Sequence, residues 1–191
     1  MRNGTANPRT FALVGILAAI LFAAIWIIAA HEDPSWTLGT NTLSDMGISD
    51  VEVTANLFNY GCVVSGLLLA VFGIGKATCE TGANRTGGML LIAAAMFFVC
   101  VGFVTKDVGN GNPHLLVAYL FFLFLVLGIV ASTVGDWMEG RGLTASVSSI
   151  LIVFCLGVSI GSTLAMTEAV VVACALLWTI LQGAKLLMSK A

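Results

Sequence analysis

The sequence predicts an all-α protein, a polytopic bundle of six transmembrane helices with both the N-terminus and the C-terminus in the cytoplasm. Three observations predict it: the composition, the length of the apolar stretches and the distribution of basic residues. Of the 191 residues, 59% are hydrophobic and only 9% are charged, whereas a soluble domain carries about 25% charged residues. This composition excludes an ordinary soluble globular protein. The net charge of −2, without a basic patch, gives no basis for binding nucleic acid.

Six stretches are long and apolar enough to cross a bilayer. A spanning helix needs about 20 apolar residues, because each adds about 1.5 Å against roughly 30 Å of hydrocarbon. We expect these helices near residues 11–30, 56–75, 88–105, 115–134, 145–165 and 169–187, within a single domain that covers residues 1–191. We expect no Lys, Arg, Asp or Glu in the interior of any of them. The first stretch is longer than the apolar core of a signal peptide, which is about 7 to 15 residues, so we expect it to be retained.

The basic residues predict the orientation, because cytoplasmic loops accumulate Lys and Arg. With the N-terminus in the cytoplasm, the outer loops contain one basic residue, Lys106. The inner segments contain the other seven: Arg2, Arg9, Lys76, Arg85, Arg141, Lys185 and Lys190. Most acidic residues and both histidines, His31 and His114, fall on the outer side. We therefore expect a multi-pass protein of the cell membrane whose polar chemistry lies at its outer face.

Two outer segments carry structural signals. The longest connection, residues 31–55, contains Trp36 and other apolar residues, and a loop of this length is typically functional or a lid. The spacing of Ser49 and Glu52 fits a capping box, which predicts that the second helix begins near residue 50. In residues 106–114, Asn112 fits the N-cap of the fourth helix and Pro113 fits its first position.

The outer side therefore gathers a set of candidate site residues. Ends of several helices can meet at one pocket in a six-helix bundle, and ionisable groups at membrane depth are functional by default. His114, in the first turn of the fourth helix, would act as a base or a ligand, because the positive end of the helix disfavours the imidazolium form. Glu168 would act as an acid, and Asp45 and Asp107 would orient His114 or bind a divalent cation. The expected ligand-binding residues are Ser44, Asn56, Asn59 and Trp36. No metal-ligand motif and no zinc spacing among the five cysteines is present, so we predict no metal site, and the cofactor stays open.

Each of these residues also has a structural interpretation. Glu168 lies at a helix N-terminus, where a carboxylate is favoured. Asp45 has the spacing to close a capping box with Thr42. Asp107 fits a solvated turn, His114 fits a hydrated interface, and Asn59 fits a hydrogen bond that only holds the fold together.

Several motifs resemble a known family. The loop sequence Asn41–Gly47 (NTLSDMG) is followed by Ala55–Asn59 (ANLFN) at the start of the second helix, and His114 opens the fourth helix. Together with Glu168 and Trp178 on the last helix, they resemble the prokaryotic, mostly archaeal membrane family catalogued as domain of unknown function 998. The resemblance covers nearly the whole chain and implies a six-span fold.

Two departures from that family pattern are visible. The family often has a proline in the segment after the third helix, where this chain reads Phe103–Asp107 (FVTKD), and Met46 stands where leucine is usual. A more distant likeness exists to eukaryotic six-span proteins of the damage-regulated autophagy modulator and FGF-receptor-activating protein type. That likeness implies a role connected with lipids.

Three functions are compatible with the sequence. The first is a protein that binds or modifies a membrane lipid at the outer leaflet, for example a hydrolase or transferase acting on a lipid ester, amide or headgroup. The second is a structural or partner-binding membrane protein, and the third is a transporter of a small solute or ion. The sequence names neither the ligand nor the oligomeric state.

Overall fold

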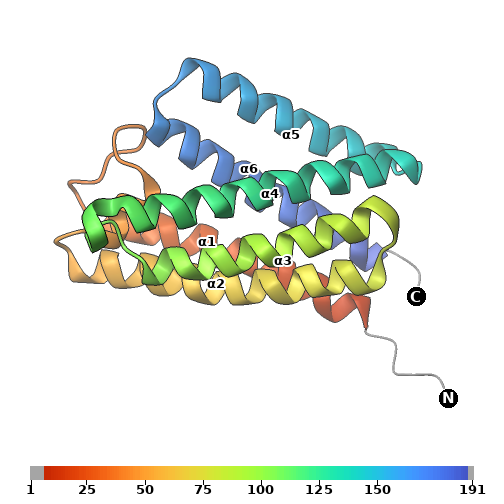
Figure 1. Ribbon diagram of the computed structural model, residues 1–191, viewed down its shortest axis with the longest axis horizontal. Coiled ribbons are helices and arrows are strands. Elements are labelled where there is room, and N and C mark those ends of the chain that lie inside the picture. Colours follow the sequence, from red (N-terminus) through yellow and green to blue (C-terminus); the bar gives the residue numbers. More distant parts are fainter. Residues whose placement is uncertain (1–6, 189–191) are drawn as a thin grey trace.

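The structure, a computed structural model, describes residues 7–188, and it confirms the six helices (Figure 1). All six are long and apolar enough to cross a membrane, so the chain is a multi-pass membrane protein. The helices are α1 (Pro8–Glu32), α2 (Glu52–Cys79), α3 (Gly82–Phe103), α4 (Asn112–Met138), α5 (Gly142–Gly161) and α6 (Leu164–Met188). Two short 3-10 helices, η1 (Leu43–Ile48) and η2 (Val108–Gly111), lie in the connections. Arg2 and Lys190, which support the predicted orientation, lie outside the described residues, and the orientation stays a prediction.

The helices run alternately up and down and form a ring (Figure 1). Each helix packs on the next one in the sequence, and α6 closes the ring against α1. Packing is most extensive among α1, α2, α3 and α4, whereas α5 makes the loosest contacts with its two neighbours. In Figure 1, α5 slopes away from the rest of the bundle. The weakest wall of the ring is therefore the one that contains α5.

Glycines explain why α2 and α3 approach so closely. A Cβ on Gly88 of α3 would lie 2.6 Å from the backbone nitrogen of Ala77, and one on Gly66 of α2 would lie 2.8 Å from the Val99 side chain. Small residues let helix backbones approach in a membrane, where packing replaces the hydrophobic driving force. By contrast, a Cβ on Gly157 of α5 would meet nothing within 4 Å, so this helix uses no close glycine contact there.

The connection between α1 and α2 folds onto one end of the bundle, which we call the η1 end. Leu43 and Met46 of η1 are buried in the hydrophobic core. The capping box that begins η1 is the one expected from Thr42 and Asp45: the Thr42 N–H donates to Asp45 Oδ2 at 2.7 Å. This short helix is therefore an ordered part of the bundle.

The capping box predicted for Ser49 and Glu52 is wrong. The N-cap of α2 is Val51, without a capping side chain. The Ser49 hydroxyl accepts a hydrogen bond from the Val51 N–H at 3.0 Å and donates to Asp33 at 2.6 Å. Ser49 was expected to begin a helix, and instead it ties the end of α1 to the start of α2.

Candidate functional site: a polar-capped apolar cavity

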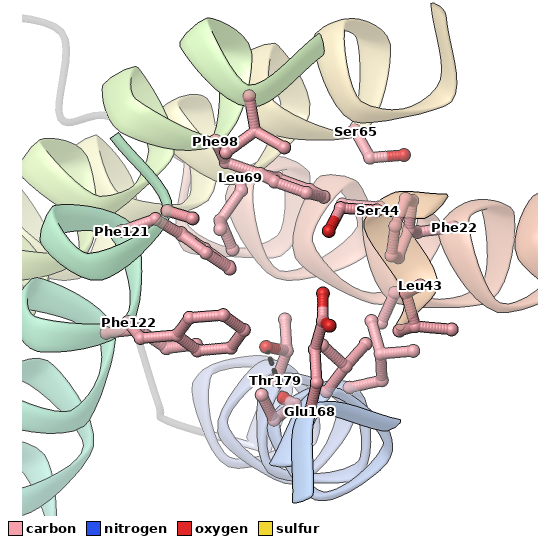
Figure 2. Close-up of a pocket in the computed structure, with 18 of the residues that line it drawn as sticks. Phe22, Leu43, Ser44, Ser65, Leu69, Phe98, Phe121, Phe122, Glu168 and Thr179 are labelled. Carbon is pink, nitrogen blue, oxygen red and sulfur yellow. Dashed lines mark hydrogen bonds between the residues drawn. The ribbon is translucent and has the colours of Figure 1, made fainter. Parts of the chain in front are cut away.

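A cavity lies inside the bundle and reaches the η1 end, where Leu43 and Ser44 line it (Figure 2). Residues of η1 and of every α-helix except α5 line it. The lining consists of Ala18, Ala19, Phe22, Leu43, Ser44, Phe58, Ser65, Leu69, Phe98, Val101, His114, Ala118, Phe121, Phe122, Leu125, Glu168, Val172, Ala175, Leu176 and Thr179. Three candidate residues from the sequence, Ser44, His114 and Glu168, therefore face one cavity although they lie on three separate elements.

His114 presents a hydrogen-bond acceptor to this cavity. Its side chain is buried, and Nδ1 lies 2.6 Å from the carbonyl oxygen of Val104. Because a carbonyl can only accept, this contact assigns the proton to Nδ1. In this tautomer Nε2 carries a lone pair, and that buried atom has no hydrogen-bond partner among residues 7–188. Such an atom costs free energy unless a ligand or water satisfies it.

Glu168 enters the cavity from the first turn of α6, and Figure 2 shows its carboxyl group pointing towards the middle of the space. The backbone N–H groups of Leu43 and Ser44 donate to that carboxyl group. Glu168 therefore helps to hold the beginning of η1. This structural role differs from the one predicted from the sequence, which was an interaction with the N-terminal end of its own helix. The hydroxyl of Ser44 lies 3.2 Å from the hydroxyl of Thr42.

A charged pair lies beside the mouth of the cavity. Lys106 Nζ lies 2.5 Å from Asp45 Oδ1 and donates to the Thr42 hydroxyl at 2.5 Å. Burial raises the pKa of Asp45, but the hydrogen bonds from Lys106 and Thr42 outweigh burial and hold this pKa below its usual range. Asp45 therefore stays ionised and keeps the only basic residue of the predicted outer side next to the site.

The structure places the remaining candidate residues away from the cavity. Asp107 accepts a hydrogen bond from the Thr105 hydroxyl in an exposed turn. Asn56 is exposed in a shallow depression between α1 and α2. Asn59 donates to the Gly47 carbonyl at 2.9 Å, and Trp36 Nε1 donates to the Thr42 carbonyl at 2.9 Å. The last two side chains hold the loop that carries Ser44, so they position the site without facing it.

The polar lining residues Ser44, His114 and Glu168 lie at the η1 end of the cavity. Beyond them the cavity is a mostly apolar channel, which we call the shaft. Its wall includes Phe22, Leu69, Phe98, Phe121, Leu125 and Leu176. The rings of Phe22 and Phe98 lie 4.9 Å apart, and those of Phe98 and Phe121 lie 4.8 Å apart, so they form one continuous aromatic side. The hydroxyl of Ser65 is buried and has no hydrogen-bond partner in the part of the chain that the structure describes, whereas that of Thr179 donates to the Ala175 carbonyl.

A second polar cluster lies at the opposite end of the bundle, and the sequence reasoning missed it. The predicted stretches 56–75 and 115–134 contain no charged residue, but α2 and α4 continue beyond them, and Lys185 lies near the end of the predicted stretch 169–187. Lys76, Asp136 and Lys185 are consequently inside these helices and are buried. The signals that could have found the cluster are the spacing of Lys76 and Glu80, four residues apart, and the short distance along α6 between Gln182 and Lys185.

The cluster connects four helices through charge-assisted hydrogen bonds. Lys76 Nζ lies 2.6 Å from Glu80 Oε2 and 2.7 Å from Gln182 Oε1. Lys185 Nζ lies 2.6 Å from Glu80 Oε1 and 2.8 Å from Asp136 Oδ1, and it donates to Asn84 of α3 at 3.0 Å. Gln182 donates to Asp136 at 2.9 Å. Because two buried cations face two buried anions, we interpret the cluster as a structural tie among the helices.

Glu80 lies at the centre of this cluster, in the turn between α2 and α3. Burial raises its pKa, but the charges of Lys76 and Lys185 outweigh burial and hold the pKa below its usual range. Arg141 lies 3.9 Å from Glu80 and 3.0 Å from Glu139 at the more exposed edge. Within residues 7–188, no group of three or more His, Cys, Asp or Glu side chains is placed to hold a metal ion.

The comparison with known proteins agrees with the motifs of the loop and of the helix ends. Residues 16–185 match the family described as "Protein of unknown function (DUF998)". The chain belongs to this family. The match covers η1, the cavity and the buried ion cluster, so both polar features lie within the shared region. Neither a curated protein nor a solved structure matches the chain significantly.

Proposed function

We propose that this DUF998 protein binds a membrane lipid at the outer leaflet, with the lipid's polar head under η1 and its apolar part in the shaft. The observation that carries the proposal is the lone pair of His114 Nε2, which is buried and has no partner among the described residues, at the η1 end of a mostly apolar cavity. A ligand that pairs with this atom needs a hydroxyl or N–H donor attached to an apolar body. Membrane lipids with protic headgroups have this chemistry. The orientation follows from the positive-inside distribution of the basic residues.

Binding is better supported than catalysis by the contacts of the polar side chains. A Ser–His nucleophile needs a hydrogen bond between the two side chains. Here the Ser44 hydroxyl is paired with Thr42, and the carboxyl group of Glu168 accepts backbone N–H groups. Each polar group except His114 Nε2 therefore already has a structural partner near the cavity's upper end. We accordingly assign the site a ligand and no reaction.

The test compares lipid retention by two histidine variants. The full chain is reconstituted in vesicles of phosphatidylethanolamine and phosphatidylglycerol, extracted gently and examined by native mass spectrometry. Wild type retains a lipid, whereas His114→Ala binds it about fivefold more weakly, because one hydrogen bond contributes on the order of 1 kcal/mol. His31→Ala is the matched control, because His31 is exposed at the end of α1 and does not line the cavity. Absence of lipid from wild type, or equal retention in both variants, contradicts the proposal.

A further inference from the structure

The shaft has a side opening between α4 and α6, which we call the portal. The portal is a groove lined by Leu115, Tyr119 and Val126 on α4 and by Leu164 and Val171 on α6, with a volume of about 290 Å³. It exists because α4 and α6 are not among the helix pairs that pack extensively. Most of these side chains are apolar and well exposed along helices that cross the membrane. The portal therefore faces lipid along part of its length.

The portal and the shaft meet at their polar upper end. Ala118 and Phe122 of α4 line both of them, as do Ser44, His114 and Glu168. An amphiphile that moves sideways from the bilayer would therefore reach His114 Nε2 with its head at the η1 end. Its chain would already lie parallel to the helices. This route avoids passing an apolar chain through water, which costs about 0.8 kcal/mol for each CH₂ group.

The dimensions of the shaft favour a single chain. The volume of the cavity is about 70 Å³. For comparison, a space that holds one water molecule has roughly 10 to 15 Å³ when volume is counted in the same way. The polar residue Glu168 at the top and the lining residue Thr179 near the floor are eleven positions apart on α6, which corresponds to about 16 Å at 1.5 Å per residue. His114 and Leu125 on α4 are separated by the same number of positions. Because a volume of about 70 Å³ is spread over this depth, the space suits one extended acyl chain better than two.

We propose that the ligand is a single-chain amphiphile with a hydroxyl head, such as a monoacylglycerol, and that it is admitted from the bilayer through the portal. The head donates to His114 Nε2, and the shaft measures the length of the acyl chain. This inference rests on the proposed function and goes beyond it by naming the chain number, the chain length and the route. The lining residues farthest from the η1 end, among them Leu125 and Leu176, limit the length of the chain.

Chain length is tested with two adjacent residues of α6. Leu176 lines the shaft, whereas the side chain of Leu177 is 58% exposed on the other side of the helix. Binding of tritiated monopalmitin and monooctanoin to the full chain in phosphatidylcholine nanodiscs is measured by scintillation proximity. Leu176→Trp weakens monopalmitin binding at least tenfold and leaves monooctanoin within twofold of wild type. Leu177→Trp leaves both unchanged. If Leu176→Trp fails to fold, Leu125→Phe on the opposite wall provides the same measurement.

The number of chains and the route are tested in the same assay. Dipalmitoylglycerol, which has two chains, binds wild type at least tenfold more weakly than monopalmitin. Ala118→Trp, at the junction of portal and shaft, slows association of monopalmitin at least tenfold. Equal binding of the one-chain and two-chain lipids, or an unchanged association rate, overturns the inference.

The failure of this inference differs from the failure of the proposed function. If lipid retention depends on His114 but not on chain length or on Leu176, the pocket binds lipid and the shaft does not hold an acyl chain. If neither monoacylglycerol binds and His114→Ala retains as much lipid as wild type, the proposed function itself is wrong.

Discussion

Removing one charge from the buried ion cluster should destabilise the protein far more than removing a charge at its edge. Asp136 is fully buried and accepts hydrogen bonds from Lys185 and Gln182. Asp136→Asn keeps the shape but removes the negative charge, so Lys185 retains only one anionic partner, Glu80. Breaking a buried ion pair costs about 3–5 kcal/mol. Because one anion remains, we expect the lower end, a loss of about 3 kcal/mol in the free energy of unfolding.

The assay is reversible unfolding by SDS in mixed micelles, followed by tryptophan fluorescence. Trp178 is a suitable reporter, since the centre of its ring lies 5.9 Å from Lys76 Nζ in the cluster. The matched control is Glu139→Gln, which removes the ion pair with Arg141 between side chains that are 30% and 36% exposed. Exposed pairs contribute about 0–1 kcal/mol. If Asp136→Asn shifts the free energy of unfolding by no more than Glu139→Gln does, the cluster is not a structural tie.

Three further predictions concern pH, the loop and helix packing. The folded protein holds the pKa of Glu80 below its ordinary value of 4.5. The stability that the Glu80 carboxylate contributes is therefore present above pH 4.5 and is lost as the pH falls towards the lowered pKa. Between about pH 7 and pH 3, the Tm of wild type should fall more steeply than that of Glu80→Gln. Asn59→Ala should lower the free energy of unfolding by about 1 kcal/mol and make residues 33–51 more sensitive to limited proteolysis, because the hydrogen bond to Gly47 of η1 is lost. Asn56→Ala, at an exposed position, should change neither the stability nor the proteolysis. Equal effects of the two variants would refute the role of Asn59 in holding the loop. Gly88→Ala should lower the free energy of unfolding in SDS by about 1–3 kcal/mol, because its Cβ would meet the backbone of α2. Gly157→Ala should leave the free energy of unfolding unchanged or raise it by up to about 1 kcal/mol. An unchanged stability of Gly88→Ala would show that α2 and α3 can separate without cost.

The fold was predictable from the sequence because the bilayer imposes a length on every apolar stretch. Hydropathy locates the six helices, but it places the predicted end of each helix at the first polar residues. The structure shows helices continuing beyond that point, as at Lys76 and Asp136, because buried partners compensate the charge. The anionic partner of Lys76, Glu80, is only four residues away, but Gln182 lies 106 residues from Lys76, and Lys185 lies 49 residues from Asp136. Local spacing can therefore indicate the first pair, whereas no local pattern carries the long-range contacts that complete the cluster.

The candidate site was predictable only in part, for a related reason. Residue type and position at a helix end were enough to select His114 and Glu168, which the structure brings to one cavity. The same reasoning could not separate Asn56 from Asn59, because the two amides are three positions apart on one helix. Only the packing of η1 decides that one is exposed and the other binds a carbonyl. The apolar shaft was also missed, since Phe and Leu residues inside a membrane helix look the same whether they fill a core or line a space.

The cross-helix ion cluster has a consequence for the synthesis of the protein. As the chain leaves the ribosome, Lys76 can find Glu80 immediately, because the two are close neighbours in sequence. Asp136 has to wait for its counter-charge, because Lys185 belongs to the last helix made. Until α6 is inserted, the nascent protein therefore holds a carboxylate that has no counter-charge, and the final helix completes its neutralisation. Chains arrested before residue 182 are expected to be degraded faster than full-length chains, which pulse-chase labelling can measure.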